Sequence, residues 1–307
     1  MYDIIGDIHG YASALEELLH KMNYKKVKGV WQHPGRKVIF VGDYIDRGPA
    51  IRETLQIVRT MQENNTAIAL MGNHEYNALA YDYELADGTF LRPHDAKNIK
   101  QHEETLKQFE AYQQEWPDYL NWFYSLALFL DLPELRAVHA CWDQKDIDWL
   151  KDKNLYRMNK ELLFSSHKEG SNEYKVINNI LKGIEYIVPG EYAWQDKDGH
   201  YRTENRIKWW VDPQQSSYGQ LLFDCPKPMA KIMNENINSI PYSKGAPPVF
   251  FGHYWLEDAY PVVQAANVIC LDYSIAKKGN LVAYRWNGEE QIDNRHFVFV
   301  NYKDGRQ

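Results

Sequence analysis

Residues 38–49 read Val-Ile-Phe-Val-Gly-Asp-Tyr-Ile-Asp-Arg-Gly-Pro, an apolar run of strand length that ends in a turn carrying two carboxylates and an arginine. The same theme precedes this stretch at 2–10, where Tyr-Asp-Ile-Ile leads into Gly-Asp-Ile-His-Gly. It follows again at 66–75, where Thr-Ala-Ile-Ala-Leu leads into Met-Gly-Asn-His-Glu. Strands that alternate with helical patterns predict βαβ units and a largely parallel sheet that is covered on both faces. In such sheets a functional site lies at the carboxyl ends of the strands, where all of these polar clusters fall.

The remaining chain adds strands and one long segment that is difficult to read. Residues 76–125 look mostly helical, and a further strand at 135–138 ends at His139. Residues 247–251 form another apolar run that leads into Gly252-His253, and the patterns at 268–271, 281–286 and 297–300 predict antiparallel strands. We interpret residues 1–307 as a single domain, with a cap or insert at about 143–245 that lies over the strand ends.

Composition excludes several classes of protein. With 44% hydrophobic residues and no low-complexity run, the chain of 307 residues is neither disordered nor fibrous. The 35 basic and 42 acidic residues give a net charge of −7, which is no electrostatic footprint for nucleic acid. No stretch approaches the roughly 20 apolar residues of a membrane span. Three widely spaced cysteines favour a reducing cytoplasm over a disulfide framework.

Polar side chains at the strand ends form a set with metal-ligand chemistry. Carboxylate, imidazole and amide oxygen together suit manganese, iron or zinc, and the absence of a thiolate disfavours a structural zinc finger. Two metals that clamp both oxygens of an in-line displacement need a bridging carboxylate, and Asp43 is the natural bridge because its strand lies between the others along the chain. The candidate ligands are Asp7, His9, Asp43, Asn73, His139 and His253.

The motifs resemble those of a known superfamily. Gly-Asp-Ile-His-Gly, Gly-Asp-Tyr-Ile-Asp-Arg-Gly and Gly-Asn-His-Glu, in this order within 75 residues and followed by isolated histidines, are similar to those of the calcineurin-like metallophosphoesterases. The Gly-Asp-x-x-Asp-Arg-Gly form resembles the phosphoprotein-phosphatase branch, which includes bacterial symmetrical diadenosine tetraphosphatases. The resemblance covers residues 1–75, 120–143 and 247–290 and implies an α/β (α+β) fold, a four-layer α/β/β/α sandwich with mixed sheets.

The resemblance also implies roles for individual residues. One metal is expected on Asp7 and His9 and a second on Asn73, His139 and His253, with Asp43 between them. His74 corresponds to the general acid that protonates the leaving oxygen. Asp46 is expected to hydrogen-bond His74 and raise its pKa, since an anionic partner favours imidazolium. Arg47 is expected to bind the substrate phosphate, because a planar guanidinium can hold two oxygens at once.

Some positions depart from the pattern of the branch. Met71 stands where phosphatases of eukaryotic type have an arginine before Gly-Asn-His-Glu, so one phosphate-binding group is missing or comes from elsewhere. Arg202 and Arg206 are candidates to replace it. The His-Gly-Gly motif of the phosphatases of eukaryotic type is His139-Ala140-Cys141 in this chain, which is closer to the His-Ala-Gly of the dinucleotide hydrolases. Trp255 stands where many superfamily members have a further metal-binding histidine.

Other conspicuous residues receive simpler interpretations. Glu75 is expected to cap or to form a local salt bridge. The histidines outside the motifs, His102 and His167 among them, lie in polar or loop-like surroundings and are expected at the surface. Trp209-Trp210 favours core or cap packing over a base-stacking platform. Cys141 is not expected to be a nucleophile, because no phosphate-cradling loop follows it.

These observations predict a hydrolase of phosphate esters, a phosphatase that depends on two divalent metal ions. Manganese is the expected metal, with iron or zinc as alternatives, and a metal-bridging hydroxide would attack phosphorus in line. The expected substrate is a phosphoprotein, a nucleotide or a small phosphoester, handled in the cytoplasm without membrane or nucleic-acid partners. Two alternatives stay open: a hydrolase of dinucleotide polyphosphates, and a non-catalytic, metal-containing binding or scaffold protein.

Overall fold

The computed structural model describes residues 1–195, 201–289 and 291–301, and its first sheet carries the three motif turns. Strand order in this sheet is β14-β15-β1-β4-β5, with β16 beside β15. The motif strands β1, β4 and β5 are parallel, as the sequence predicts, whereas β15 runs antiparallel to β1, β14 and β16. The strands are β1 (Tyr2–Ile5), β4 (Lys37–Phe40), β5 (Ala67–Ala69), β14 (Asp272–Tyr273), β15 (Asn280–Trp286) and β16 (Phe297–Asn301).

A second sheet carries the two later histidines, in the order β13-β12-β7-β6. Its strands are β6 (Phe129–Asp131), β7 (Arg136–Val138), β12 (Val249–Phe251) and β13 (Val268–Cys270). Strands β7, β12 and β13 are parallel, and only β6 runs antiparallel. The prediction that β13 belongs to an antiparallel group was wrong. All of its residues are buried, and a continuous apolar run of this kind is typical of a parallel strand covered on both faces.

The two sheets pack against each other. Side chains alternate between the faces of a strand, so neighbouring residues of β1 and β4 enter different cores. Ile4 and Ile39 join Phe250 and Ile269 of the second sheet in one hydrophobic cluster. This cluster fills the space between the sheets. The first sheet is therefore covered on both faces, but one of the covering layers is a second sheet and not helices.

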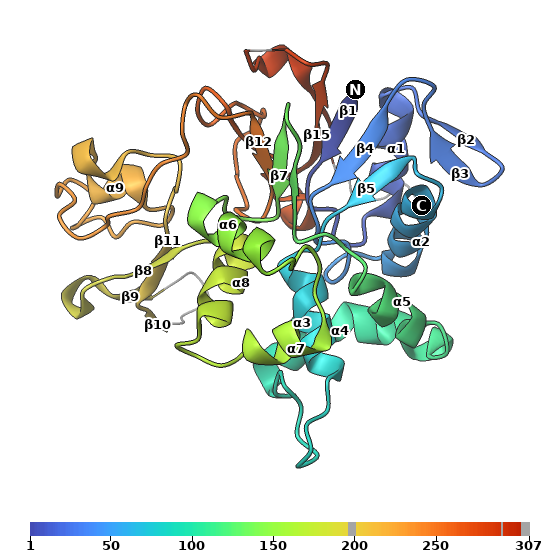
Figure 1. Ribbon diagram of the computed structural model, residues 1–307, viewed down its shortest axis with the longest axis horizontal. Coiled ribbons are helices and arrows are strands. Elements are labelled where there is room, and N and C mark those ends of the chain that lie inside the picture. Colours follow the sequence, from blue (N-terminus) through green and yellow to red (C-terminus); the bar gives the residue numbers. More distant parts are fainter. Residues whose placement is uncertain (196–200, 290, 302–307) are drawn as a thin grey trace.

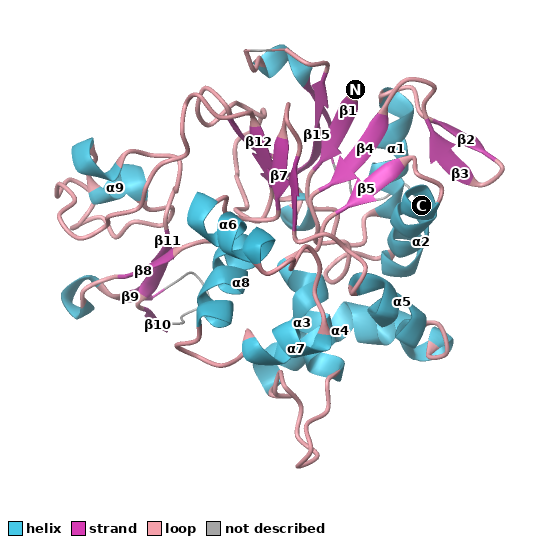
Figure 2. Cartoon of the chain, viewed as in Figure 1, coloured by secondary structure: helices cyan, strands magenta, loops and turns pink. Residues whose placement is uncertain are grey.

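Helices form the two outer layers. The opposite faces of the strands, with Ile5 and Phe40 in the first sheet and Val138 and Phe251 in the second, belong to the main core together with the buried sides of the helices. The helices α1 (Ala12–Lys21) and α2 (Ile51–Glu63) cover the first sheet, and α6 (Gln144–Asp152) and α8 (Asn172–Lys182) lie beside the second (Figure 2). The expected four-layer α/β/β/α arrangement with mixed sheets is confirmed.

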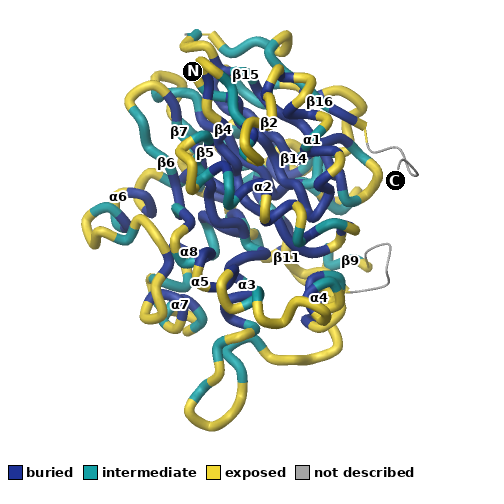
Figure 3. The backbone as a smooth tube through the Cα atoms, turned by 90° about the vertical axis from the view of Figure 1, so that its right-hand side faces the viewer, coloured by how far each residue is buried: buried dark blue, intermediate teal, exposed yellow. Residues whose placement is uncertain are grey.

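A group of helices lies beneath the ends of the motif strands (Figure 1). These are α3 (Asn73–Asp82), α4 (Ala96–Phe109), α5 (Trp116–Phe123) and α7 (Lys160–Ser165). The prediction that residues 76–125 are mostly helical is confirmed. Figure 3 shows the buried backbone concentrated along the sheets and the exposed backbone at the outer helices and loops.

The segment 143–245 falls into two structurally different parts. The first part, with helices α6 and α8, shares the main core. The second part has a small hydrophobic cluster of its own, built around Val188, Ile207 and Leu222. Its elements are β8 (Glu185–Ile187), β9 (Trp194–Gln195), β10 (Tyr201–Arg202), β11 (Glu204–Arg206) and α9 (Tyr218–Leu221). Residues 196–200 of the segment lie outside the described residues, and its role as a cap stays a prediction.

Two further features complete the architecture. A short hairpin of β2 (Lys25–Val27) and β3 (Val30–Gln32) follows α1. None of the helices in the described part of the chain combines the length and apolarity that a membrane crossing requires.

Candidate active site

The turns that follow the strands hold non-glycine residues in left-handed backbone conformations. The φ angles are +48° at His9, +56° at Asp43, +67° at Asp46, +71° at Arg47 and +74° at His253. Such residues are uncommon at positive φ and cost about 1–3 kcal/mol each, and they persist where the surrounding structure holds them. These five residues lie in three of the turns that carry candidate residues, and they mark this edge of the sheets as a candidate functional site.

Two glycines allow these turns to approach one another. A Cβ atom on Gly252 would lie 1.9 Å from Asp7 Oδ1, and one on Gly72 would lie 2.2 Å from Asp43 Oδ1. Only a residue without a side chain leaves room for the carboxylates at these positions.

Glu75 ties two of the turns together. Its carboxylate accepts hydrogen bonds from the backbone N–H groups of Gly72 at 2.9 Å, Asp43 at 3.0 Å and Tyr44 at 2.8 Å. Burial and the nearby Asp43 carboxylate raise the pKa of Glu75 to about 7. The expected local capping is therefore accompanied by a longer-range role, which positions the turn that bears Asp43.

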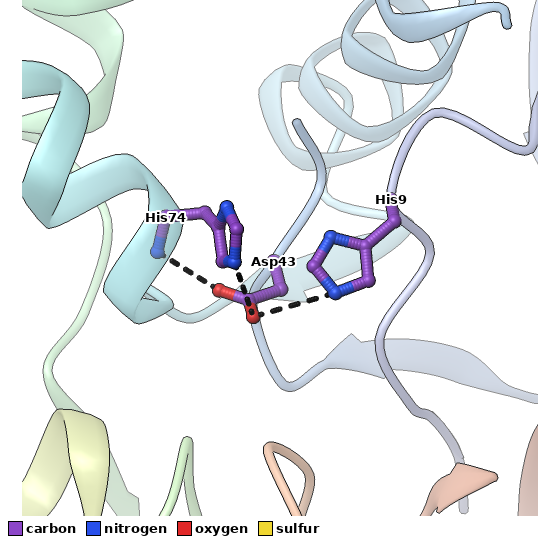
Figure 4. Close-up of side chains that lie close together, drawn as sticks. All are labelled: His9, Asp43 and His74. Atoms are coloured by element: carbon purple, nitrogen blue, oxygen red, sulfur yellow. Dashed lines mark hydrogen bonds and ion pairs between the residues drawn. The ribbon is translucent and has the colours of Figure 1, made fainter. Parts of the chain in front are cut away.

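The two oxygens of Asp43 face histidines from different sheets. Oδ2 lies 3.7 Å from His9 Nε2, and Oδ1 lies 3.4 Å from His139 Nε2. Figure 4 shows His9 and His74 on either side of the Asp43 carboxylate. One carboxylate that presents its two oxygens to two sets of donors has the geometry of a bridge between two cations.

Asn73, His253 and Asp7 complete the set of candidate ligands. Asn73 Oδ1 lies 3.0 Å from His139 Nε2 and 2.7 Å from His253 Nδ1. Asp7 Oδ2 accepts a hydrogen bond of 3.0 Å from the backbone N–H of His253. The fold thus brings together the six positions that the sequence predicts as metal ligands.

Unsatisfied atoms show that the site fits divalent metal ions. Asp7 Oδ1, His9 Nε2 and His253 Nε2 are buried and make no hydrogen bond to any residue that the structure describes. Burial, with the carboxylates of Asp272 and Asp43 close by, raises the pKa of Asp7, so a cation would relieve a real electrostatic penalty.

Backbone carbonyls orient two of the imidazole rings. His9 Nδ1 lies 3.0 Å from the carbonyl oxygen of Ile45, and His139 Nδ1 lies 2.8 Å from that of Val41. Each of these nitrogens donates its proton to the carbonyl, so Nε2 presents its lone pair to the centre of the site. This is how proteins fix the tautomer of a metal-binding histidine.

His74 and Asp46 form the expected pair. His74 Nδ1 lies 2.5 Å from Asp46 Oδ2, and His74 Nε2 lies 3.9 Å from Asp43 Oδ2. Burial opposes protonation of the ring, but the carboxylates of Asp43 and Asp46 outweigh it, and the pKa of His74 is raised. The imidazolium form can therefore present a proton at Nε2 toward the centre of the site.

Asp46 has two further partners that the sequence did not indicate. Its Oδ1 accepts from His102 Nδ1 at 2.7 Å and from Thr105 Oγ1 at 2.5 Å. Burial favours the neutral carboxyl, but the hydrogen bonds from His102 and His74 prevail and lower the pKa of Asp46. The prediction that His102 lies at the surface was wrong: it is 6% exposed.

Arg47 is held by stacking. Its guanidinium lies 4.1 Å from the ring centroid of Trp255, and Lys277 Nζ lies 4.3 Å from the same centroid. The backbone N–H of Trp255 donates to Asp272 Oδ2 at 2.7 Å, which fixes the ring's position. A planar guanidinium stacked on indole keeps its N–H donors free for a ligand in the plane. No sequence pattern pointed to this contact.

Met71 stands where related phosphatases have a phosphate-binding arginine. The two arginines proposed to take over this role, Arg202 and Arg206, lie in different surroundings. Arg206 in β11 is half-buried. The burial of His253 lowers the pKa of this histidine most, and the charge of Arg206 is the next largest cause. Arg202 in β10 is exposed. Both charges act on Glu185. Of the two, it is Arg206 that the structure brings toward the candidate metal ligands.

Two simpler expectations are confirmed. Trp209 is buried in the main core, where its indole N–H donates to the carbonyl oxygen of Ala140 at 3.1 Å. Cys141 is buried, and burial raises the pKa of its thiol, so it is not an activated nucleophile.

Comparisons with known proteins agree with this geometry. The family model of the calcineurin-like phosphoesterases matches residues 2–253. The chain is 45% identical over 74 residues to the asymmetrical bis(5'-nucleosyl)-tetraphosphatase PrpE of Halalkalibacterium halodurans, a match that covers 24% of this chain and 30% of that protein. It is 25% identical over 309 residues to a symmetrical bis(5'-nucleosyl)-tetraphosphatase of Vibrio parahaemolyticus, with 94% of this chain and 96% of that protein covered.

A solved structure was also compared with this chain. A protein serine/threonine phosphatase from Saccharomyces cerevisiae matches all of this chain and 80% of its own at a TM-score of 0.49 and 13% identity. The match to the PrpE proteins covers less than a third of their length, whereas the family model extends over most of this chain. The chain therefore belongs to the calcineurin-like phosphoesterase family.

Proposed function

We propose that the protein is a two-metal hydrolase of phosphate esters and anhydrides. The observation that carries this proposal is the Asp43 carboxylate, whose two oxygens face His9 on one side and His139 on the other. One ion would be held by Asp7, His9 and Asp43, and the other by Asp43, Asn73, His139 and His253. Manganese is the metal we propose, because carboxylate, amide and imidazole donors without a thiolate suit it.

The reaction needs proton delivery as well as metal ions. Two divalent ions bound here would lower the pKa of a water molecule and neutralise the oxygens of the substrate. His74 holds one proton at Nδ1 against Asp46 and offers the other from Nε2 to the departing oxygen. His102 and Thr105 fix the Asp46 carboxylate, so the orientation of His74 is set before the substrate binds.

Phosphate binding falls to arginines. Arg47 is oriented by Trp255 and can donate two hydrogen bonds to the non-bridging oxygens of the substrate. We assign the second phosphate-binding group to Arg206, whose charge reaches His253 and which has no ion pair among the described side chains. Charge that accumulates on the phosphoryl oxygens during in-line attack would be stabilised by both.

A hydrolase of dinucleotide polyphosphates is the second candidate. The full-length similarity to a symmetrical bis(5'-nucleosyl)-tetraphosphatase favours it, and so does His139-Ala140 in place of His-Gly. Products distinguish the two: inorganic phosphate from a phosphopeptide, or ADP from diadenosine tetraphosphate. A non-catalytic scaffold is disfavoured because no expected ligand is missing. The three cysteines are free thiols, which supports a cytoplasmic location.

Replacing the bridge tests the proposal directly. Asp43→Asn should abolish both metal occupancy and hydrolysis of an aryl phosphate with Mn²⁺ present, since the shared negative charge is removed. Elemental analysis and steady-state rates measure the two effects. Asp148→Asn, an exposed carboxylate on α6, is the matched control and should change neither. An Asp43→Asn protein with two metals per chain and full activity would show that the site is assigned wrongly.

A further inference from the structure

Two cations beside α3 have no carboxylate partner. The guanidinium of Arg92 donates to the neutral amide oxygens of Asn77 at 3.1 Å and Gln101 at 2.7 Å. Lys182 Nζ lies 5.2 Å from the ring centroid of Tyr76. Within the described part of the chain, neither side chain makes an ion pair, and both are only half-exposed. Each side chain has therefore lost part of its hydration without gaining a counter-charge at ion-pair distance.

Arg92 lies next to the reacting groups, and Lys182 lies over Tyr76, two residues after His74 on α3. Arg92 lines the same small cavity as His74 and Asp46, and Asn77, which it binds, is one helical turn beyond His74 on α3. Lys182 ends α8, and the following Gly183 packs against Tyr254: a Cβ atom there would lie 2.4 Å from Tyr254 Oη. Lys182 is therefore held between α3 and the residue that follows His253.

The two charges act on each other and on the same neighbours. Burial, followed by the charge of Arg92, lowers the pKa of Lys182 to about 8. Burial also lowers the pKa of His167, which stacks on Tyr76, to about 4, and both Lys182 and Arg92 add to this effect. Glu185 acts on Lys182 only from beyond ion-pair distance. An anion that binds both cations would offset their repulsion and their desolvation.

We propose that Arg92 and Lys182 form a second anion subsite, which binds the phosphate next to the scissile one on the leaving-group side. The inference rests on the proposed function, because His74 defines that side by giving its proton to the departing oxygen. The substrates that fit are phosphoanhydride chains, from a nucleotide or from inorganic polyphosphate. Attack by water forms one P–O bond and breaks the anhydride P–O bond. The electron pair stays on the departing phosphate oxygen, which takes the proton of His74, and the proton that the attacking water loses passes to solvent.

Substrates with and without a second phosphate test the subsite. Arg92→Gln and Lys182→Gln in the Mn²⁺-loaded enzyme should each lower kcat/KM for inorganic tripolyphosphate and for diadenosine tetraphosphate roughly tenfold to hundredfold, the effect of losing one charge-assisted hydrogen bond. Neither change should affect p-nitrophenyl phosphate, which has no second phosphate. Lys182→Arg should keep most of the activity, and Lys160→Gln, an exposed lysine on α7, is the matched control.

The outcomes separate the subsite from the proposed function. Equal losses on p-nitrophenyl phosphate and on tripolyphosphate would mean that the two residues only support α3, and unaltered tripolyphosphate kinetics would overturn the subsite outright. A binding readout is independent of turnover: with EDTA present, tripolyphosphate should raise the melting temperature of the wild-type chain but not of the double variant. Wild-type protein that binds tripolyphosphate but hydrolyses no substrate would support the subsite and contradict the proposed function.

Discussion

Strand β1 has a buried aspartate near each of its ends, and the two differ in every contact. Asp3 Oδ2 accepts from Tyr24 Oη and from Arg36 Nε, each at 2.9 Å, and Oδ1 accepts from Arg285 Nε at 3.1 Å. Asp7, which follows the other end of the strand, accepts one backbone hydrogen bond through Oδ2 and none through Oδ1.

The comparison separates structural electrostatics from functional electrostatics. Both carboxylates are buried, at 0% and 2% exposure, so both have lost their hydration. For Asp3, hydrogen bonds from two guanidinium groups and a phenol replace the lost hydration. No described side chain replaces the lost hydration of Asp7, and a bound cation would supply the missing contacts. The buried charge without partners therefore lies at the end of β1 that carries the candidate site.

The largest expected effect is the loss of activity on substitution of Asp7, the aspartate without side-chain partners. Asp7→Asn should abolish turnover and metal binding, because a charged ligand is lost. The free energy of unfolding of the metal-free protein should stay the same or rise, since a desolvated charge is removed while the amide oxygen can still accept from His253. Urea titration with EDTA present measures this. A loss of several kcal/mol in that titration would contradict the contrast between the two ends.

Removal of the acid should lower the rate without emptying the site. His74→Ala should keep its metals but lose about 10²–10⁴-fold in turnover, the usual contribution of positioned proton transfer. The loss should shrink for nitrophenyl esters, whose leaving groups need no proton. His20→Ala, an exposed histidine on α1, serves as the control. Equal losses for good and poor leaving groups would remove His74 from the acid role.

Substitution of Asp3, the aspartate with side-chain partners, is expected to change stability and not activity. Asp3→Asn should lower the free energy of unfolding by about 3–5 kcal/mol, because it leaves Arg36 and Arg285 buried without their counter-charge. Metal content and the rate per folded molecule should be unchanged. A variant with normal stability but reduced metal occupancy would show that the two ends of β1 are coupled and not separate.

The smallest effect concerns pH. Burial and the Asp3 carboxylate raise the pKa of Tyr24 well above its ordinary value of 10.0. Below about pH 10 the phenol is neutral in both states and this group contributes no pH dependence. Above that pH the unfolded chain releases the proton and the folded chain keeps it, so stability falls as pH rises. Tyr24→Phe should be less stable at pH 7 by about 1.5–3 kcal/mol.

The alkaline slope is the diagnostic measurement for this variant. Unfolding free energies between pH 9 and 11 should fall less steeply for Tyr24→Phe than for the wild type, since one titrating group is gone. Parallel slopes would mean that Tyr24 ionises alike in both states and that its bond to Asp3 is weak.

One helix shows why part of the site could not be predicted. Residues 96–109 form α4, whose apolar Ile99 and Leu106 suggest the inward face. In the structure these two are 42% and 37% exposed, whereas His102 and Thr105 are buried against Asp46. The prediction that residues 76–125 are mostly helical was correct, but the two apolar residues would have placed the wrong face of α4 inward. A polar face that serves a buried carboxylate leaves no apolar signature in the sequence.

What the sequence by itself determined is local: the strands, and the polar turns at their carboxyl ends. Each motif lies within a few residues, so the sequence places Asp43 and Asp46 in one turn and His74 in another. The resemblance to the calcineurin-like phosphoesterases implied that Asp46 and His74 meet. Contacts between distant segments were decided only by the tertiary structure. Trp255 meets Arg47, and Lys182 meets Tyr76, because layers far apart in the chain pack together. A sequence records which side chains are available, whereas burial decides which charges lack partners and can therefore bind a ligand.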